Sequence, residues 1–119
     1  WDILPTFAEL AGLRNPRKID GISFVPAMFG KPQAEHEYLY WEFHEGSSKQ
    51  AVRMRKWKAV RLAPSQAIEL YNLNSDIGEE DNIANRHPDI IARAKEIMDN
   101  IRTDADVWPL KNKAGTMPF

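Results

Sequence analysis

The middle of the chain is made of short runs in which apolar and polar side chains alternate. In the clearest run, residues 37–44 (EYLYWEFH), one face carries Leu39, Trp41 and Phe43. Alternation with period two and aromatic enrichment are typical of a β-strand. Further runs predict strands at residues 50–54, 57–62 and 68–73. The join at Arg55-Lys56 leaves room only for a tight turn, although neither residue is the Gly or Asn that such turns favour.

After the polar segment 74–85, apolar side chains recur at the spacing of an α-helix. Pro88 suits a first helical position, and Asp89 suits the positive end of the helix dipole. The pattern predicts a helix over residues 88–103 that packs on one face of the sheet. Its apolar positions are Ile90, Ile91, Ala94, Ile97, Met98 and Ile101. The predicted fold class is therefore α+β, a small four-stranded antiparallel sheet packed by a C-terminal amphipathic helix.

The two ends of the chain carry weaker patterns. Asp2 is expected to cap a short N-terminal helix, and Gly12 is expected to stop it. Its apolar side consists of Ile3, Leu4, Phe7, Leu10 and Ala11. Residues 23–29 predict a short helical or irregular segment. Residues 104–119 show no period and are expected to be loose or wrapped over a neighbouring part.

Composition narrows the functional classes. Hydrophobic residues make up 43% of the 119 residues, which is enough for a packed core. Sixteen Lys and Arg balance seventeen Asp and Glu, a ratio that disfavours a general nucleic-acid-binding protein. The absence of cysteine excludes disulfides and thiolate chemistry. Because the chain starts at Trp1 without an initiator Met, we expect it to be a truncated piece of a longer protein.

The sequence contains no self-contained metal or catalytic motif. Asn72, Asn74 and Asp76 have the spacing of a calcium loop, but Ile77 and Ile83 stand where such a loop needs Gly and Glu. The segment is instead expected to be a turn whose side chains bond its own backbone. No Ser lies in a Gly-x-Ser-x-Gly elbow, and no two histidines have metal-ligand spacing.

Among the histidines, His44 has the most suggestive position. His36 is expected at the surface. His87 is expected either at a helix cap or at the surface. His44 ends a strand and meets a Gly-Ser loop beside Glu42 and Glu45. Loops at strand ends often carry binding residues. His44 is therefore either an exposed strand-end residue or part of a binding loop.

A second candidate surface is basic. Trp57 is surrounded in the sequence by five cations: Arg53, Arg55, Lys56, Lys58 and Arg61. Basic residues interleaved with an aromatic can bind an anionic polymer, so a small binding module is the alternative function. In alternating strands the same pattern also gives one solvated face and one core face. The near-neutral net charge favours the solvated face.

Five motifs, in the same order, resemble the C-terminal portion of formylglycine-dependent sulfatases of the alkaline-phosphatase superfamily, such as arylsulfatases and N-acetylgalactosamine-6-sulfatases. They are DILPTFAELAG (2–12), DGISF (20–24), YWEFH with QAVR (40–53), ELYNL with its following acidic turn and NIA (69–84), and the HP pair (87–88). The likeness extends from residue 2 to about residue 103. The resemblance divides the chain into three parts. Residues 1–34 would be the end of a large α/β domain whose remainder is absent from this chain. Residues 35–104 would form a C-terminal subdomain, and residues 105–119 a tail.

The resemblance implies a sulfuric ester hydrolase acting on sulfated saccharides or aryl sulfates, with a formylglycine nucleophile and a calcium ion. The formylglycine motif Cys/Ser-x-Pro-x-Arg is absent from this chain, so it is expected to be inactive alone, with no catalytic or metal residue. The candidate substrate contacts are His44, Glu45, Lys49 and Gln50. Similar enzymes are commonly exported. Without the large domain, the apolar side of the first helix is expected to cause self-association.

Overall fold

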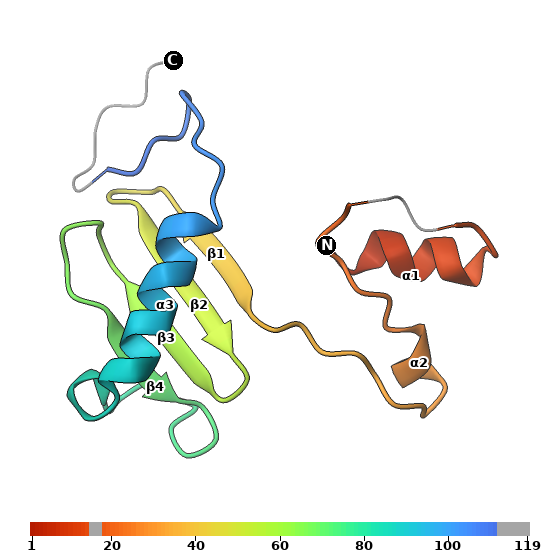
Figure 1. Cartoon of the computed structure of the whole chain (residues 1–119), viewed down its shortest axis with the longest axis horizontal. Coiled ribbons are helices and arrows are strands. Elements are labelled where there is room, and N and C mark those ends of the chain that lie inside the picture. The colour runs from red at the N-terminus through yellow and green to blue at the C-terminus, as the bar shows by residue number, and fades with distance from the viewer. Residues whose placement is uncertain (15–17, 112–119) are drawn as a thin grey trace. The chain divides into compact units, whose positions relative to one another are not determined.

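The chain folds as two compact units, Trp1–His36 and Glu37–Phe119 (Figure 1). The structure is a computed structural model that describes residues 1–14 and 18–111. Among these residues, no helix is both long enough and apolar enough to cross a membrane.

The first unit contains two short helices, α1 (Ile3–Leu10) and α2 (Val25–Met28). Thr6 is fully buried and joins α1 to the segment that leads into α2. Its hydroxyl donates to the carbonyl of Asp2 at 2.6 Å and accepts the amide of Phe24 at 3.1 Å. Because this buried hydroxyl both donates and accepts a hydrogen bond, it holds the two segments together.

Two predictions for α1 have different outcomes. Gly12 follows the helix with φ +68, as expected for a glycine stop. The prediction that Asp2 caps the helix with its side chain is wrong. The Asp2 carboxylate instead accepts the amide of Ile22 at 2.9 Å and contacts Nε2 of His36 at 2.9 Å. His36, expected at the surface, is thus tied into the first unit.

The second unit is a meander of four antiparallel strands in the order β1-β2-β3-β4 (Figure 1). The strands are β1 (Leu39–Phe43), β2 (Lys49–Met54), β3 (Trp57–Arg61) and β4 (Glu69–Asn72). A single 3₁₀ turn, η1 (Ala84–Arg86), precedes the helix α3 (Pro88–Asn100). The predicted α+β fold, a four-stranded antiparallel sheet packed by a C-terminal helix, is confirmed.

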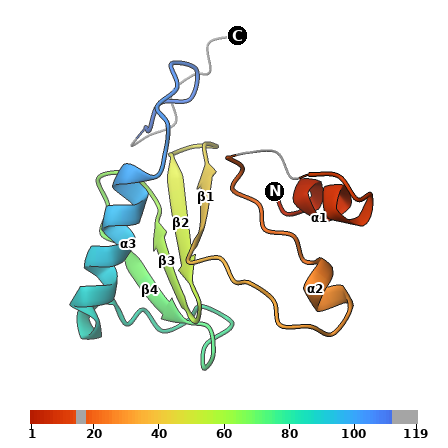
Figure 2. The same cartoon turned by 45° about the vertical axis from the view of Figure 1, so that its right-hand side comes forward.

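Helix α3 lies along one face of the sheet (Figure 2). The shared core is formed by Val52, Ala59, Ile68, Leu70, Ala94, Ile97 and Met98. Ile90 and Ile91 are half-buried against it. The prediction for Ile101 is wrong, because the helix ends at Asn100 and leaves Ile101 42% exposed.

The β2–β3 hairpin turns on two residues, since Met54 pairs with Trp57. Arg55 has φ +54, a left-handed conformation that a residue with a side chain adopts at some cost. A tight turn therefore forms without glycine. In the polar segment after β4, the Asp76 carboxylate accepts the amides of Glu80 and Asp81, as expected for a turn that bonds its own backbone.

Candidate functional site

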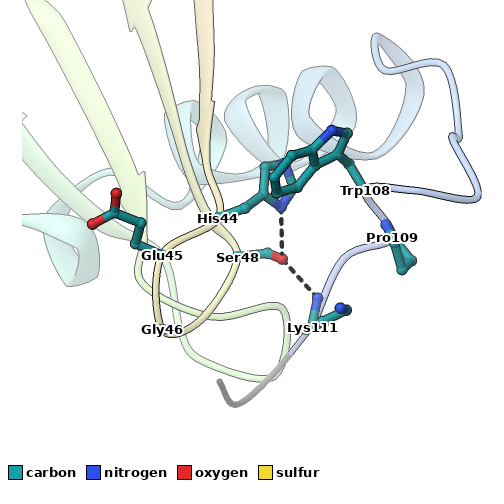
Figure 3. A pocket seen from close by; sticks show the side chains of 7 residues that line it. All are labelled: His44, Glu45, Gly46, Ser48, Trp108, Pro109 and Lys111. Atoms are coloured by element: carbon teal, nitrogen blue, oxygen red, sulfur yellow. Dashed lines mark hydrogen bonds between the residues drawn. The ribbon is translucent and has the colours of Figure 1, made fainter. Parts of the chain in front are cut away.

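A pocket of about 210 Å³ lies where the β1–β2 loop (residues 44–48) meets the C-terminal segment (residues 102–111) (Figure 3). It is lined by His44, Glu45, Gly46, Ser48, Trp108, Pro109 and Lys111. Both contributors are irregular backbone at one end of the sheet. Such segments commonly carry binding residues on a rigid scaffold.

Ser48 fastens the C-terminal segment to the loop. Its amide donates to the carbonyl of Lys111 at 2.8 Å, and its hydroxyl oxygen accepts the amide of Lys111 at 2.7 Å. The same oxygen lies 3.1 Å from Nδ1 of His44. Figure 3 shows the dashed lines that join His44 to Ser48 and Ser48 to Lys111. The segment and the loop therefore form one structural piece.

Arg102 makes a second attachment. Its side chain is only 9% exposed, and its Nε donates to the Glu42 carboxylate at 2.8 Å. Its Nη2 donates to the carbonyl of Trp108 at 3.2 Å. Of the two expectations for the tail, loose or wrapped over a neighbour, the described residues show the second.

Glu42 is the charge on which these contacts converge. Besides Arg102, it accepts hydrogen bonds from the hydroxyl of Tyr40 and from Nε2 of His44, at 3.0 Å for His44. Burial acts to raise the pKa of Glu42, but the hydrogen bonds from Arg102 and Tyr40 outweigh it and hold the pKa below its usual 4.5. Glu42 is therefore ionised at neutral pH. Burial, and after it the hydrogen bond to Glu42, raise the pKa of Tyr40.

Ser48, His44 and Glu42 have the hydroxyl–imidazole–carboxylate connectivity of a hydrolase triad. A nucleophile must reach its substrate, however, and Ser48 is only 1% exposed. Its oxygen is also occupied by the amide of Lys111. The arrangement therefore holds the loop in shape, and both ring nitrogens of His44 are engaged inside the chain.

The predicted contact Gln50 is a core residue, only 1% exposed. Its amide nitrogen donates to the hydroxyl of Tyr40 at 2.8 Å and to the carbonyl of Met98 at 3.1 Å. Its oxygen accepts Nε and Nη2 of Arg61 at 2.9 and 2.6 Å. In this conformation the amide has no hydrogen-bonding capacity left for an outside ligand.

The other predicted contacts have freer head groups. Lys49 lies on the sheet face opposite α3, where its ammonium sits 5.3 Å above the ring of Phe43. Glu45 lines the pocket edge, and its carboxylate points away from Trp108 (Figure 3). Sequence reasoning missed Trp108 and Lys111, since neither belongs to a periodic element.

The basic cluster around Trp57 does not form one surface. Arg53 and Lys58 pair across β2 and β3 on the face away from α3, and Lys58 forms an ion pair with Glu79. Trp57 packs toward the core with its ring 4.7 Å from that of His87. Arg61 is buried. The alternative of a basic binding face therefore finds no support in the positions of these side chains.

Comparison with known proteins identifies the family. Residues 1–104 match the family model described as "N-sulphoglucosamine sulphohydrolase, C-terminal". The chain belongs to the sulfatase family. The resemblance inferred from the motifs is thereby confirmed.

Two relatives that are named as sulfatases support the assignment to this family. The chain is 30% identical over 110 residues to the Delta 4,5-hexuronate-2-O-sulfatase of Bacteroides thetaiotaomicron, covering 86% of this chain and 23% of that protein. It is 29% identical to human arylsulfatase K, covering 75% of this chain and 19% of that protein. The chain thus spans about a fifth of the length of these sulfatases.

A solved structure agrees with the fold. The Ps i-CgsB protein, in complex with k-i-k-neocarrahexaose, superposes with a TM-score of 0.72 at 29% identity. The alignment covers 84% of this chain and 23% of that one. The sheet and the helix of this chain are therefore shared with part of a larger solved structure.

The described residues do not fit the calcium ion or the formylglycine that the resemblance implies. Among residues 1–14 and 18–111, no group of three or more acidic or imidazole side chains could hold a metal ion. The whole sequence contains no cysteine, and none of its serines has Pro and Arg at the spacing of the formylglycine motif.

Proposed function

We propose that the protein carrying this chain is a sulfuric ester hydrolase acting on sulfated saccharides or aryl sulfates, and that this chain is its non-catalytic C-terminal part. The match of residues 1–104 to a sulfatase C-terminal family carries the proposal. The small share of each relative that the chain covers supports a larger parent. The formylglycine and the calcium ion would both belong to the remainder of that protein.

The same proposal gives the β1–β2 loop a place beside the substrate. In the Ps i-CgsB structure the bound molecule is a saccharide, which favours a saccharide for this parent as well. Glu45 and Lys49 supply head groups that a sugar hydroxyl or an anionic substituent can reach. His44 positions the loop, because its ring bonds Ser48 and Glu42.

Sulfate release by the full-length protein tests this proposal. The full-length protein is expected to release sulfate from sulfated disaccharides prepared from heparin or chondroitin sulfate, while the 119-residue chain releases none. Within the full-length protein, Lys49→Ala is expected to raise KM about threefold, because an exposed charge contact with an anionic substrate is modest.

Lys56→Ala is the matched control, since it removes an ammonium from the β2–β3 turn, where Met54 pairs with Trp57. Sulfate release by the isolated chain would refute the proposal that this chain is the non-catalytic part of the enzyme. Equal KM values for wild type and Lys49→Ala would remove Lys49 from the substrate contacts.

Self-association of the isolated chain is a further expectation. The apolar side of α1 is exposed in the first unit, at Ile3, Leu4, Phe7 and Leu10. Exposed apolar surface of this kind favours association, and in the full-length protein we propose that the large domain covers it. Light scattering at micromolar concentration is expected to give a mass above that of the monomer, and Phe7→Glu is expected to restore the monomer. A monomeric wild-type chain would contradict this.

A further inference from the structure

Trp108 is a large aromatic side chain held open to solvent. It is 45% exposed, although tryptophan is among the side chains that gain most from burial. Its ring leans on that of His44, with centroids 5.6 Å apart and planes tilted by 41°. One ring surface is thus supported by the protein, while part of the indole remains accessible.

The segment that carries Trp108 is fixed on both sides of it. Upstream, Arg102 bonds Glu42 and the carbonyl of Trp108 itself. Downstream, the carbonyl of Lys111 accepts the amide of Ser48, and the amide of Lys111 donates to the Ser48 hydroxyl oxygen. The position of the ring is therefore set before any ligand arrives, which reduces the entropy lost on binding.

Two charged side chains line the pocket, Glu45 and Lys111, and the carboxylate of Glu45 points away from Trp108 (Figure 3). His44 and Ser48 use their polar atoms within the chain. Lys111 lines the pocket, and its ammonium forms no ion pair with any residue among 1–14 and 18–111. An aromatic ring next to a free cation suits a ring-shaped ligand with an anionic substituent.

We propose that Trp108 is a stacking platform for one pyranose ring of an anionic saccharide, and that Lys111 binds the sulfate or carboxylate on that ring. The pocket volume of about 210 Å³ is below the ~300–1,000 Å³ of most ligand sites, so it suits one sugar ring. The inference rests on the proposed function, because the saccharide is the substrate of the parent enzyme. Trp108 then determines specificity and takes no part in sulfate-ester cleavage.

The test compares two kinds of substrate in the full-length protein: sulfated disaccharides from heparin or chondroitin sulfate, and 4-nitrocatechol sulfate, which has no sugar ring. Trp108→Ala is expected to raise KM for the disaccharide about tenfold with little change in kcat. The KM for 4-nitrocatechol sulfate is expected to stay the same. Trp108→Phe, which keeps an aromatic face, is expected to recover most of the affinity. Lys111→Ala keeps the backbone bonds to Ser48 and is expected to raise the same KM.

Val107→Ala is the matched control, since Val107 is exposed on the same segment and does not line the pocket. A full-length protein without any sulfatase activity would refute the proposed function. An active protein whose disaccharide KM is unchanged by Trp108→Ala, or raised equally by Val107→Ala, would overturn only the stacking platform. Turnover of 4-nitrocatechol sulfate with none of the disaccharides would overturn the saccharide assignment.

Discussion

Replacing Gln50 with alanine is expected to lower the free energy of unfolding of the chain by about 4 kcal/mol. The amide bonds Tyr40, Arg61 and the carbonyl of Met98. Without it, the guanidinium of Arg61 would stay buried with only Asp99, at 3.0 Å, as a charged partner. A buried charge that loses most of its hydrogen bonds is among the costliest single changes in a protein. Urea unfolding followed by far-ultraviolet circular dichroism measures the change.

Lys49→Ala is the control for this experiment. Lys49 precedes Gln50 on β2 but lies on the opposite face, where its ammonium contacts the Phe43 ring. Its replacement is expected to cost less than about 1 kcal/mol. If Gln50→Ala were no more destabilising than Lys49→Ala, Gln50 would not be the structural residue that its hydrogen bonds indicate.

The elements that the sequence predicted well are those with a local repeat. Strands β1 to β4 and helix α3 begin within two residues of their predicted starts. The apolar period in α3 placed Ala94, Ile97 and Met98 in the core, where the structure has them. The period failed at Ile101 because the helix ends one residue earlier, and the apolar pattern does not encode that end.

The candidate site was only partly predictable. Alternation along β2 places Gln50 on the same face as the core residue Val52, so a period-two argument could have identified it as inward-facing. The resemblance to sulfatases instead indicated Gln50 as a substrate contact of the loop. From the sequence alone, a polar residue beside a Gly-Ser loop is expected to be exposed unless its buried partner is known. That partner, Arg61, faces it only through the register of β2 with β3.

The contacts between the loop and the C-terminal segment had no sequence signal. Ser48 and Lys111 are 63 residues apart, and Glu42 and Arg102 are 60 apart. Each is one polar pair without periodicity, so only the folded chain brings them together. Trp108 acquires its place in the pocket through these pairs, and a tail residue thereby becomes part of the candidate site.

Replacing Arg102 with alanine is expected to lower the free energy of unfolding by about 3 kcal/mol at pH 7. The change leaves the ionised Glu42 without its strongest partner and releases the carbonyl of Trp108. The pKa of Glu42 in the folded chain lies below the 4.5 of an unfolded glutamate. A depressed carboxyl pKa contributes stability that is present above 4.5 and is lost as the pH falls through the folded value. The cost of Arg102→Ala is therefore expected to shrink below pH 4.5.

Urea unfolding of wild type and Arg102→Ala between pH 7 and pH 3 isolates the contribution of the Glu42–Arg102 pair to the free energy of unfolding, since the other carboxylates titrate in both proteins. Arg93→Ala is the matched control, because Arg93 forms exposed ion pairs with Glu37 and Glu96. Exposed pairs contribute little, so its cost is expected to stay below about 1 kcal/mol. A cost for Arg102→Ala that is as small as this, or that does not vary with pH, would show that the Glu42–Arg102 pair does not hold the C-terminal segment. The position of Trp108 would then depend on the hydrogen bonds of Lys111 to Ser48 and on the ring contact with His44.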